Sequence, residues 1–317
     1  MSEYVIRAEN LGRDYGKFRA LDNLNLNIPK GRVVALLGPN GAGKTTFIKL
    51  LLGMLEPTRG NCFVMDKSSR SLPKSVVSKI GYMGDMDEPP GWTTISQLME
   101  IQAGASSGFD KKYFIQSMKK QGLPMSKAYG SLSKGQKKWV RASLVLSGKP
   151  DILLLDEPAE GLDPSVRKDL YDQLRDYVID SDATVIVATH IISDIERIAD
   201  DVAIIDHGHL VAHADLEELR DQVREVQLGV GEKLPELSDK LQVLGSKTSD
   251  GARIVWIKCP EDARDVLEDL LGEKVVMWTV SLETFYLAIT EHSSGQEVQG
   301  PADDMNSEQT ELKEIEK

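Results

Sequence analysis

The sequence predicts an α/β protein in which a large domain with a mostly parallel, buried central sheet precedes a small α+β domain. Up to about residue 220, apolar runs of strand length alternate with helical patterns. These runs include 33–37, 152–155 and 185–188. The later patterns are strands at 225–230, 241–244, 253–258 and 275–280, and helices at 260–271 and from Leu282. We therefore expect domains over residues 1–220 and 221–290.

The composition indicates a globular protein with no nucleic-acid partner. Of its 317 residues 41% are hydrophobic, and its formal net charge of -12 argues against a generally basic surface. Only Cys62 and Cys259 are present and they are far apart, so neither a disulfide framework nor a thiolate zinc site is indicated. The N-terminus lacks the pattern of a secretory signal, and the apolar runs are too short to span a membrane. We expect a cytoplasmic protein.

The last segment, residues 291–317, has a different composition from the rest. It is polar and charged and contains almost no apolar residues. Such a segment buries too little surface to offset the entropy lost on ordering. We expect a disordered acidic tail.

A glycine-rich loop follows the apolar run 33–37 and precedes an apolar helical pattern that begins at Thr46. The loop reads Gly38-Pro39-Asn40-Gly41-Ala42-Gly43-Lys44-Thr45. Glycines allow the backbone N–H groups to turn toward phosphate oxygens, and the helix N-terminus adds positive potential. Lys44 is expected to reach the β- and γ-phosphates and Thr45 to ligate Mg²⁺. The segment 38–46 therefore predicts a site for ATP and Mg²⁺, although the loop alone leaves kinases, GTPases and other ATPases open.

Two other strand ends carry polar residues suited to the same chemistry. Asp156 and Glu157 follow the run 152–155, and His190 follows the strand pattern 184–189. Asp156 can hold Mg²⁺, usually through water, while Glu157 can activate the attacking water as a general base. Taken singly, such residues are more often a solvated strand exit or a structural histidine.

The order of these motifs resembles the ATP-binding subunits of ABC transporters. Residues 131–136 (Ser-Leu-Ser-Lys-Gly-Gln) resemble the ABC signature, and 152–158 resemble the Walker B strand that follows it. Residues 161–164 match the D-loop, and His190 matches the switch histidine. The resemblance covers about the first two-thirds of the chain, and it implies an ABC-type P-loop NTPase fold with a helical signature subdomain over about 86–148.

The resemblance also implies roles for individual residues. Glu157 and His190 would be catalytic, with His190 contacting the γ-phosphate and the water. The signature loop would contact the nucleotide of the opposite subunit, which implies a homodimer or a heterodimer. The residues expected at that contact are Ser133, Lys134, Gly135, Gln136 and Asp163. Tyr15 matches the aromatic residue that stacks on adenine, and its alternative is a turn tyrosine that packs locally.

Three features depart from the family pattern or leave alternatives open. Asp85 stands where the family has Gln or Glu, and it is either a metal ligand with altered reach or a solvated loop acid. Trp92 lies where such subunits receive the membrane protein, and it is either a contact anchor or locally packed. His207, His209 and His213 suit one face of a strand, but the pattern favours a hairpin in which they have no catalytic role.

The end of the predicted small domain, residues 280–290, resembles ATPase subunits of ABC-2-type exporters, although Phe285, Leu287 and Ile289 also suit a plain core. We expect an ATP-hydrolysing subunit that dimerises with ATP and powers transport, by analogy export, through separately encoded transmembrane permease subunits at the inner face of the membrane. The alternative is a soluble ABC ATPase that acts on ribosomes or nucleic acid. A degenerate, regulatory subunit is disfavoured because Glu157 and His190 are present.

Overall fold

The computed structural model describes residues 3–84, 88–106, 108–229, 240–249, 252–260, 263–271 and 281–293, together with 232, 234, 235, 237 and 238. Asp85, the strand predicted at 275–280 and most of the predicted tail lie outside the described residues. In the part of the chain that is described, no helix has the length and hydropathy needed to cross a membrane.

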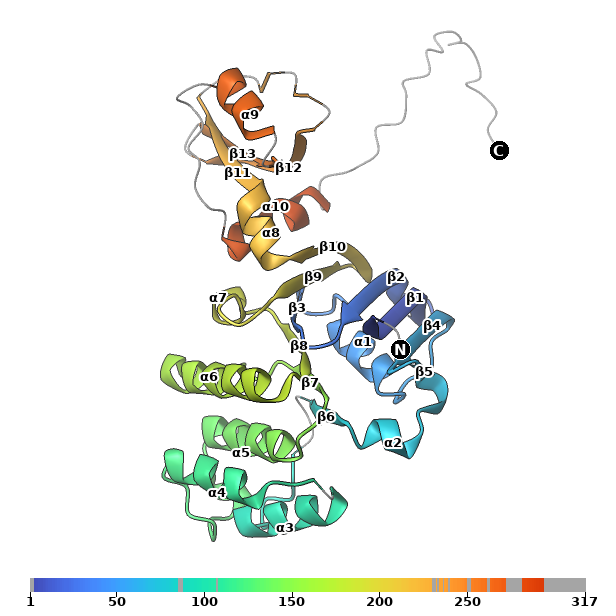
Figure 1. Cartoon of the computed structure of the whole chain (residues 1–317), viewed down its shortest axis with the longest axis vertical. Coiled ribbons are helices and arrows are strands. Elements are labelled where there is room, and N and C mark those ends of the chain that lie inside the picture. Colours follow the sequence, from blue (N-terminus) through green and yellow to red (C-terminus); the bar gives the residue numbers. More distant parts are fainter. Residues whose placement is uncertain are drawn as a thin grey trace, which may run out of the picture.

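A six-stranded sheet in the order β10-β9-β3-β8-β7-β6 forms the centre of the molecule, as Figure 1 shows. Its strands are β3 (Val33–Leu37), β6 (Ile80–Met83), β7 (Ile152–Asp156), β8 (Thr184–Thr189), β9 (Asp201–Asp206) and β10 (His209–Asp215). All pairings are parallel except that of β10 with β9. The predicted parallel sheet is confirmed, and the histidines at 207–213 do lie on a hairpin.

Both faces of this sheet are buried, which explains why its strands are continuously apolar. Alternate side chains of one strand point to opposite faces. Ala35 and Leu37 therefore join one hydrophobic cluster, while Val34 and Leu36 join another. The first face is covered by α5 (Lys134–Ser147), α6 (Pro164–Ser181), α7 (Ile192–Ile195) and α8 (Leu216–Gln222), and the second by α1 (Lys44–Leu51).

The second face is also covered by an antiparallel sheet in the order β2-β1-β4-β5, which the sequence analysis did not anticipate. Its strands are β1 (Tyr4–Tyr15), β2 (Phe18–Pro29), β4 (Arg59–Val64) and β5 (Lys67–Ser68). The short elements after it are a 3₁₀ turn at Ser69–Ser71 and α2 (Lys74–Val77). Tyr15 and Phe18 face each other across the two-residue turn between β1 and β2.

Four helices form the region that carries the signature motif. They are α3 (Ile95–Ala105), α4 (Lys111–Lys120), α5 (Lys134–Ser147) and α6 (Pro164–Ser181), with a 3₁₀ turn at Tyr129–Ser131. The first three surround their own hydrophobic cluster, in which Phe114, Tyr129 and Trp139 are fully or almost fully buried. Because α5 packs on both this cluster and the central sheet, it fixes the signature loop relative to the sheet.

The C-terminal region has a three-stranded antiparallel sheet in the order β11-β13-β12, at the opposite end of the molecule from α3 (Figure 1). Its elements are β11 (Val223–Leu228), β12 (Gln242–Ser249), β13 (Ala252–Lys258) and α9 (Arg264–Leu271). They enclose a separate cluster around Val226 and Leu267.

The final helix, α10 (Leu282–Ser293), returns to the central domain. Its Leu282 and Phe285 are buried in the cluster on the first face of the central sheet, while Leu287 is exposed. The helix contacts the short helix α7 (Ile192–Ile195). Residues of another short helix, α8 (Leu216–Gln222), are buried in the same cluster. Hence the C-terminal region is attached to the large domain by its last helix as well as by its first strand.

Candidate nucleotide site

The loop between β3 and α1 has a backbone shape that only glycine supports without strain. Gly38, Gly41 and Gly43 have φ values of 155°, 86° and 113°. A Cβ on Gly38 would lie 2.1 Å from the Ile205 carbonyl oxygen, and one on Gly43 would lie 2.6 Å from that of Ala20. The loop is thus held closely between β9 and β2, and its N–H groups lead into the N-terminus of α1.

Lys44 opens α1 and crosses back over this loop. Its ammonium donates to the carbonyl oxygens of Gly38 (2.6 Å) and Pro39 (3.3 Å) and lies 3.6 Å from Glu157 Oε1. The residue is only 5% exposed, and this burial lowers the pKa of Lys44 although the nearby carboxylates oppose the effect. A cation held in so little solvent interacts strongly with an anion.

Thr45 and Asp156 supply oxygen atoms beside this ammonium. The Thr45 hydroxyl donates to Asp156 Oδ2 at 2.7 Å, across from the end of β7. Hydroxyl, carboxylate and phosphate oxygens are the donor set that Mg²⁺ prefers. The buried Oε2 of the adjacent Glu157 has no hydrogen-bond partner among the described residues, so a further polar group is accommodated there. The residues present therefore fit a Mg²⁺–phosphate group.

Glu157 is held in a strained conformation next to the predicted switch histidine. Its φ of +47° is left-handed, and its main chain is fixed by an N–H bond to Ala188 O (2.9 Å) and by Lys138, which donates to its carbonyl oxygen (2.6 Å). His190 Nδ1 lies 3.0 Å from Glu157 Oε1. The carboxylate thus connects the ends of β7 and β8. Lys138 was not predicted, since a lysine in a helix gives no sign that it is buried.

The phosphate loop, Asp156 and Glu157 line a pocket of about 230 Å³, and His190 lies outside its lining. Its lining comprises residues 39–46, Tyr15, Phe18, Ala20, Asp156 and Glu157. Tyr15 is 44% exposed, and its ring lies 4.8 Å from the Arg13 guanidinium. Phe18, which is 61% exposed, was not predicted, although its place opposite Tyr15 across a tight turn is readable from the sequence. Two exposed aromatic rings at the mouth of a phosphate pocket can hold a planar base.

The signature residues do not line this pocket. Ser133 is the N-cap of α5: its hydroxyl accepts from Gln136 N, and Gln136 Oε1 accepts from Ser133 N, both at 3.2 Å. Asp163 is the N-cap residue of α6, and Lys134 lies beside Gly161. Gln136 thus has a structural role in its own chain, because it caps the N-terminus of α5.

The carboxyl ends of three neighbouring strands, β3, β8 and β7, therefore present the phosphate loop, His190 and the Asp156–Glu157 pair. This arrangement defines a P-loop nucleotide-binding protein. Residues 21–160 match the family model described as ABC transporter. The chain belongs to the family of ABC transporter ATP-binding proteins, which are ATP-hydrolysing transporter subunits.

Curated relatives support this membership along different lengths of the chain. The bacitracin transport ATP-binding protein BcrA of Enterococcus faecalis is 31% identical over 227 residues, which cover 70% of this chain and 73% of that protein. The daunorubicin/doxorubicin resistance ATP-binding protein DrrA of Streptomyces peucetius is 30% identical over 326 residues, covering 96% of both. The second alignment extends through the C-terminal region.

Solved structures agree with the fold. An ATP-binding subunit of an ABC transporter matches with a TM-score of 0.61 and 25% identity, covering 68% of this chain and 92% of that chain. A dimeric bacterial ABC transporter cassette matches with a TM-score of 0.60 and 24% identity, covering 67% and 98%. The predicted ABC-type α/β fold is confirmed.

Proposed function

We propose that two nucleotide-binding subunits, at least one of them this chain, close around ATP, that Glu157 activates the water that hydrolyses it, and that the resulting motion drives export through separate membrane subunits. The observation that carries the proposal is the Glu157 carboxylate, 3.0 Å from His190 and 3.6 Å from Lys44 at the edge of the phosphate pocket. It is held there because the main chain of Glu157 is strained and makes two hydrogen bonds, one through its N–H group and one through its carbonyl oxygen.

The residues of the site have different roles in binding and hydrolysis. Lys44 and the loop N–H groups bind and orient the β- and γ-phosphates. Thr45 and Asp156 would hold Mg²⁺, which supplies charge neutralisation on the phosphate oxygens. Glu157 accepts a proton from the water, and His190 orients this carboxylate and contacts the γ-phosphate. Asp85, outside the described residues, stays a predicted metal ligand.

Adenine recognition and dimerisation follow from the remaining residues. Tyr15, together with Phe18, would stack on the base. Ser133, at the exposed N-terminus of α5, would donate to the γ-phosphate bound by the partner. That the signature residues line no part of their own chain's pocket supports this exchange. One of the fold matches is a dimeric bacterial ABC transporter cassette, which supports a dimer.

An exposed surface on α3 supports docking to a membrane subunit. Trp92 is 77% exposed and Ile101 65% exposed, and both line a shallow pocket with Gln97. Trp92 is therefore not packed locally, and an exposed aromatic residue of this kind is typical of an interface anchor. Such docking would place the chain peripherally at the inner face of the membrane. Named relatives act in bacitracin and lantibiotic transport and in daunorubicin/doxorubicin resistance, which supports export rather than action on ribosomes or nucleic acid.

Mg²⁺-dependent ATP turnover should be measured across protein concentrations for the wild type, Glu157→Gln and a control, Glu217→Gln. Glu217 is an exposed acid of α8, remote from the pocket. We expect turnover per subunit to rise with concentration, and Glu157→Gln to lose at least about 100-fold while forming an ATP-dependent dimer by light scattering. The control should match the wild type. Undiminished turnover of Glu157→Gln would exclude Glu157 as the base, and turnover independent of concentration would exclude the dimer mechanism.

A further inference from the structure

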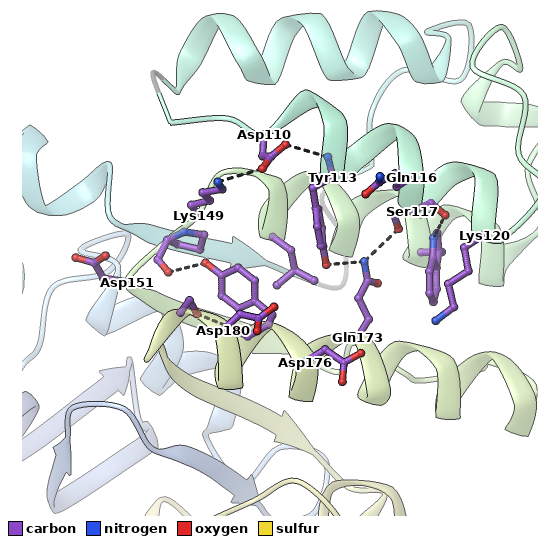
Figure 2. A pocket seen from close by; sticks show the side chains of 15 residues that line it. Asp110, Tyr113, Gln116, Ser117, Lys120, Lys149, Asp151, Gln173, Asp176 and Asp180 are labelled. Atoms are coloured by element: carbon purple, nitrogen blue, oxygen red, sulfur yellow. Dashed lines mark hydrogen bonds and ion pairs between the residues drawn. The ribbon is translucent and has the colours of Figure 1, made fainter.

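A second cavity, of about 650 Å³, lies between α4, α5 and α6 and shares no lining residue with the nucleotide pocket (Figure 2). Its size suits a small organic molecule. Its walls include the aromatic side chains of Tyr113, Trp139 and Tyr177, and acidic residues lie around them. Nothing in the nucleotide chemistry uses this cavity.

Gln173 is the buried polar group of the cavity. It is 9% exposed, and its side chain projects from α6 toward Tyr113 and Ser117, as Figure 2 shows. The amide nitrogen donates to Tyr113 Oη at 3.0 Å and Ser117 Oγ at 3.1 Å. The amide oxygen, Oε1, is buried without a hydrogen-bond partner among the described residues. A buried acceptor left in this way is stabilised by any ligand that brings a donor.

Three charged side chains of the cavity lining lack a close ion pair with a described residue, the carboxylates of Asp176 and Asp180 and the ammonium of Lys120, so the balance is negative. Of its four aspartates, Asp110 is paired with Lys149 at 3.0 Å and Asp151 with Lys79 at 2.9 Å. Asp176 has only a 3.6 Å contact with Arg175, and Asp180 forms no ion pair with a described residue. These two carboxylates lie one helical turn apart on α6, on either side of Tyr177.

The pKa of Tyr113 also reflects the negative charge around the cavity. Burial raises the pKa of Tyr113, and the carboxylates of Asp176, Asp180 and Asp110 raise it further despite the bond from Gln173. The polar tips of the other rings are already engaged, since Tyr177 donates to Pro150 O (2.9 Å) and Trp139 to Ser117 O (3.2 Å). Trp139 and Tyr177 are buried in the walls, whereas the ring of Tyr113 is only partly buried and leaves more surface for apolar or cationic contact. The Lys120 ammonium, 5.7 Å from the Trp139 ring centroid, already makes one such contact.

We propose that this cavity binds a small amphipathic organic cation, a primary ammonium group attached to an aromatic or aliphatic body. The ammonium donates to Gln173 Oε1 and faces Asp176 and Asp180. The body packs against Tyr113 and Tyr177. Both the donor and the positive charge are required, because a neutral molecule leaves the carboxylates unbalanced and an anion is repelled by them.

The test compares three probes of similar shape by calorimetry on the full chain. Phenethylamine is a cation at neutral pH, phenethyl alcohol is its neutral counterpart, and hydrocinnamate is an anion. We expect phenethylamine to bind with a Kd of about 1 mM, and the other two at least about 10-fold more weakly. Equal binding of the three probes, or no saturable binding of phenethylamine up to about 20 mM, would overturn the proposal.

Variants of the lining residues test whether phenethylamine binds in this cavity. Asp176 and Asp180 are exposed, so the double change Asp176→Asn with Asp180→Asn is expected to fold, and it should weaken phenethylamine binding about 5-fold. Gln173→Met removes the acceptor Oε1 and should weaken the binding of both the amine and the alcohol, while the preference for the amine, which depends on Asp176 and Asp180, remains. The matched control is Asp172→Asn, on the same helix but paired with Lys168 and outside the cavity lining. If the control weakens binding as much as the double variant, the effect is one of net charge and the site is refuted.

Discussion

The nucleotide pocket and the α4–α6 cavity differ in how the chain builds them. The pocket takes eight consecutive residues, 39–46, from one loop and the start of its helix, and adds Asp156 and Glu157 at the end of β7 and three residues of the β1–β2 hairpin. The cavity takes its lining from the sides of three helices, between Asp110 and Ser181. It is also the larger, at about 650 Å³ against 230 Å³. Volume alone would thus select the wrong site for ATP, whereas converging loop N–H groups at strand ends select the right one.

Each site contains a buried oxygen without a hydrogen-bond partner among the described residues, but in different settings. Glu157 Oε2 belongs to a residue with left-handed backbone between two strands. Gln173 Oε1 belongs to the regular interior of α6. Strain of the first kind is stored where chemistry requires it. An unstrained helix instead offers a fixed acceptor, which suits binding without reaction.

The first prediction separates function from stability in the nucleotide pocket. Replacing Lys44 with Met removes the buried ammonium but retains an unbranched side chain. We expect ATP turnover to fall at least about 100-fold, because the phosphates lose their principal cation. The stability in urea should be equal or higher, because desolvation opposes this charge in the folded state. The control is Lys49→Met on the same helix, outside the pocket lining, with turnover within about 2-fold of wild type.

The pH dependence of this difference has a defined sign. Since burial lowers the pKa of Lys44 from 10.5, the unfolded chain binds more protons than the folded chain between the lowered pKa and 10.5. The free energy of unfolding of the wild type therefore rises with pH in that window, relative to Lys44→Met. Urea titrations from pH 7 to about 10 measure this slope. A flat difference would show that Lys44 is not desolvated in the folded protein.

Local sequence determined the parts of the fold and the site that could be predicted. The strand 33–37 and the loop after it were readable because apolar run, glycines and helix follow one another directly. The switch histidine and the carboxylate pair were placed by the order of motifs. Their roles stay predictions, but the structure does bring His190 and Lys44 within 3.6 Å of the Glu157 carboxylate.

Features that depend on distant contacts were not predicted. The antiparallel sheet β2-β1-β4-β5 needs β4, which pairs with β1 across some fifty residues. Lys138 is buried only because Glu157 O lies above it, and Gln173 acquires its surroundings from α4. A three-residue difference also occurs at the end of α10, which extends to Ser293 although the tail was expected from Glu291. Each depends on tertiary contacts, which periodicity does not encode.

The second prediction tests how tightly the phosphate loop is enclosed. Gly38→Ala places a methyl group against the Ile205 carbonyl oxygen, whereas Gly41→Ala meets no atom within 4 Å. Both residues have positive φ, so both variants carry backbone strain of about 1 kcal/mol. We expect Gly38→Ala to lose about 3 kcal/mol of unfolding free energy in urea, and Gly41→Ala about 1 kcal/mol. Equal losses would mean that backbone strain alone, rather than enclosure by β9, makes glycine necessary.

The smallest effect is expected at Gln173, in the other site. Gln173→Met removes two hydrogen bonds to the hydroxyls of Tyr113 and Ser117 but also removes the unpartnered Oε1. Ser117 keeps its 2.7 Å bond to Ser143. The opposing terms should leave the unfolding free energy within about 1 kcal/mol of wild type. Leu174→Ala, at the adjacent buried position, should cost about 2–5 kcal/mol and shows that the assay can detect a loss in α6.

A large loss for Gln173→Met would mean that the glutamine is there to hold α4 to α6. The cavity would then be a by-product of packing, unlike the nucleotide pocket, in which Lys44 is expected to be dispensable for stability. A loss within the expected range, together with weaker binding of the ammonium probe, would place Gln173 in the same category as Lys44. Both would be polar groups that the fold tolerates and a ligand uses.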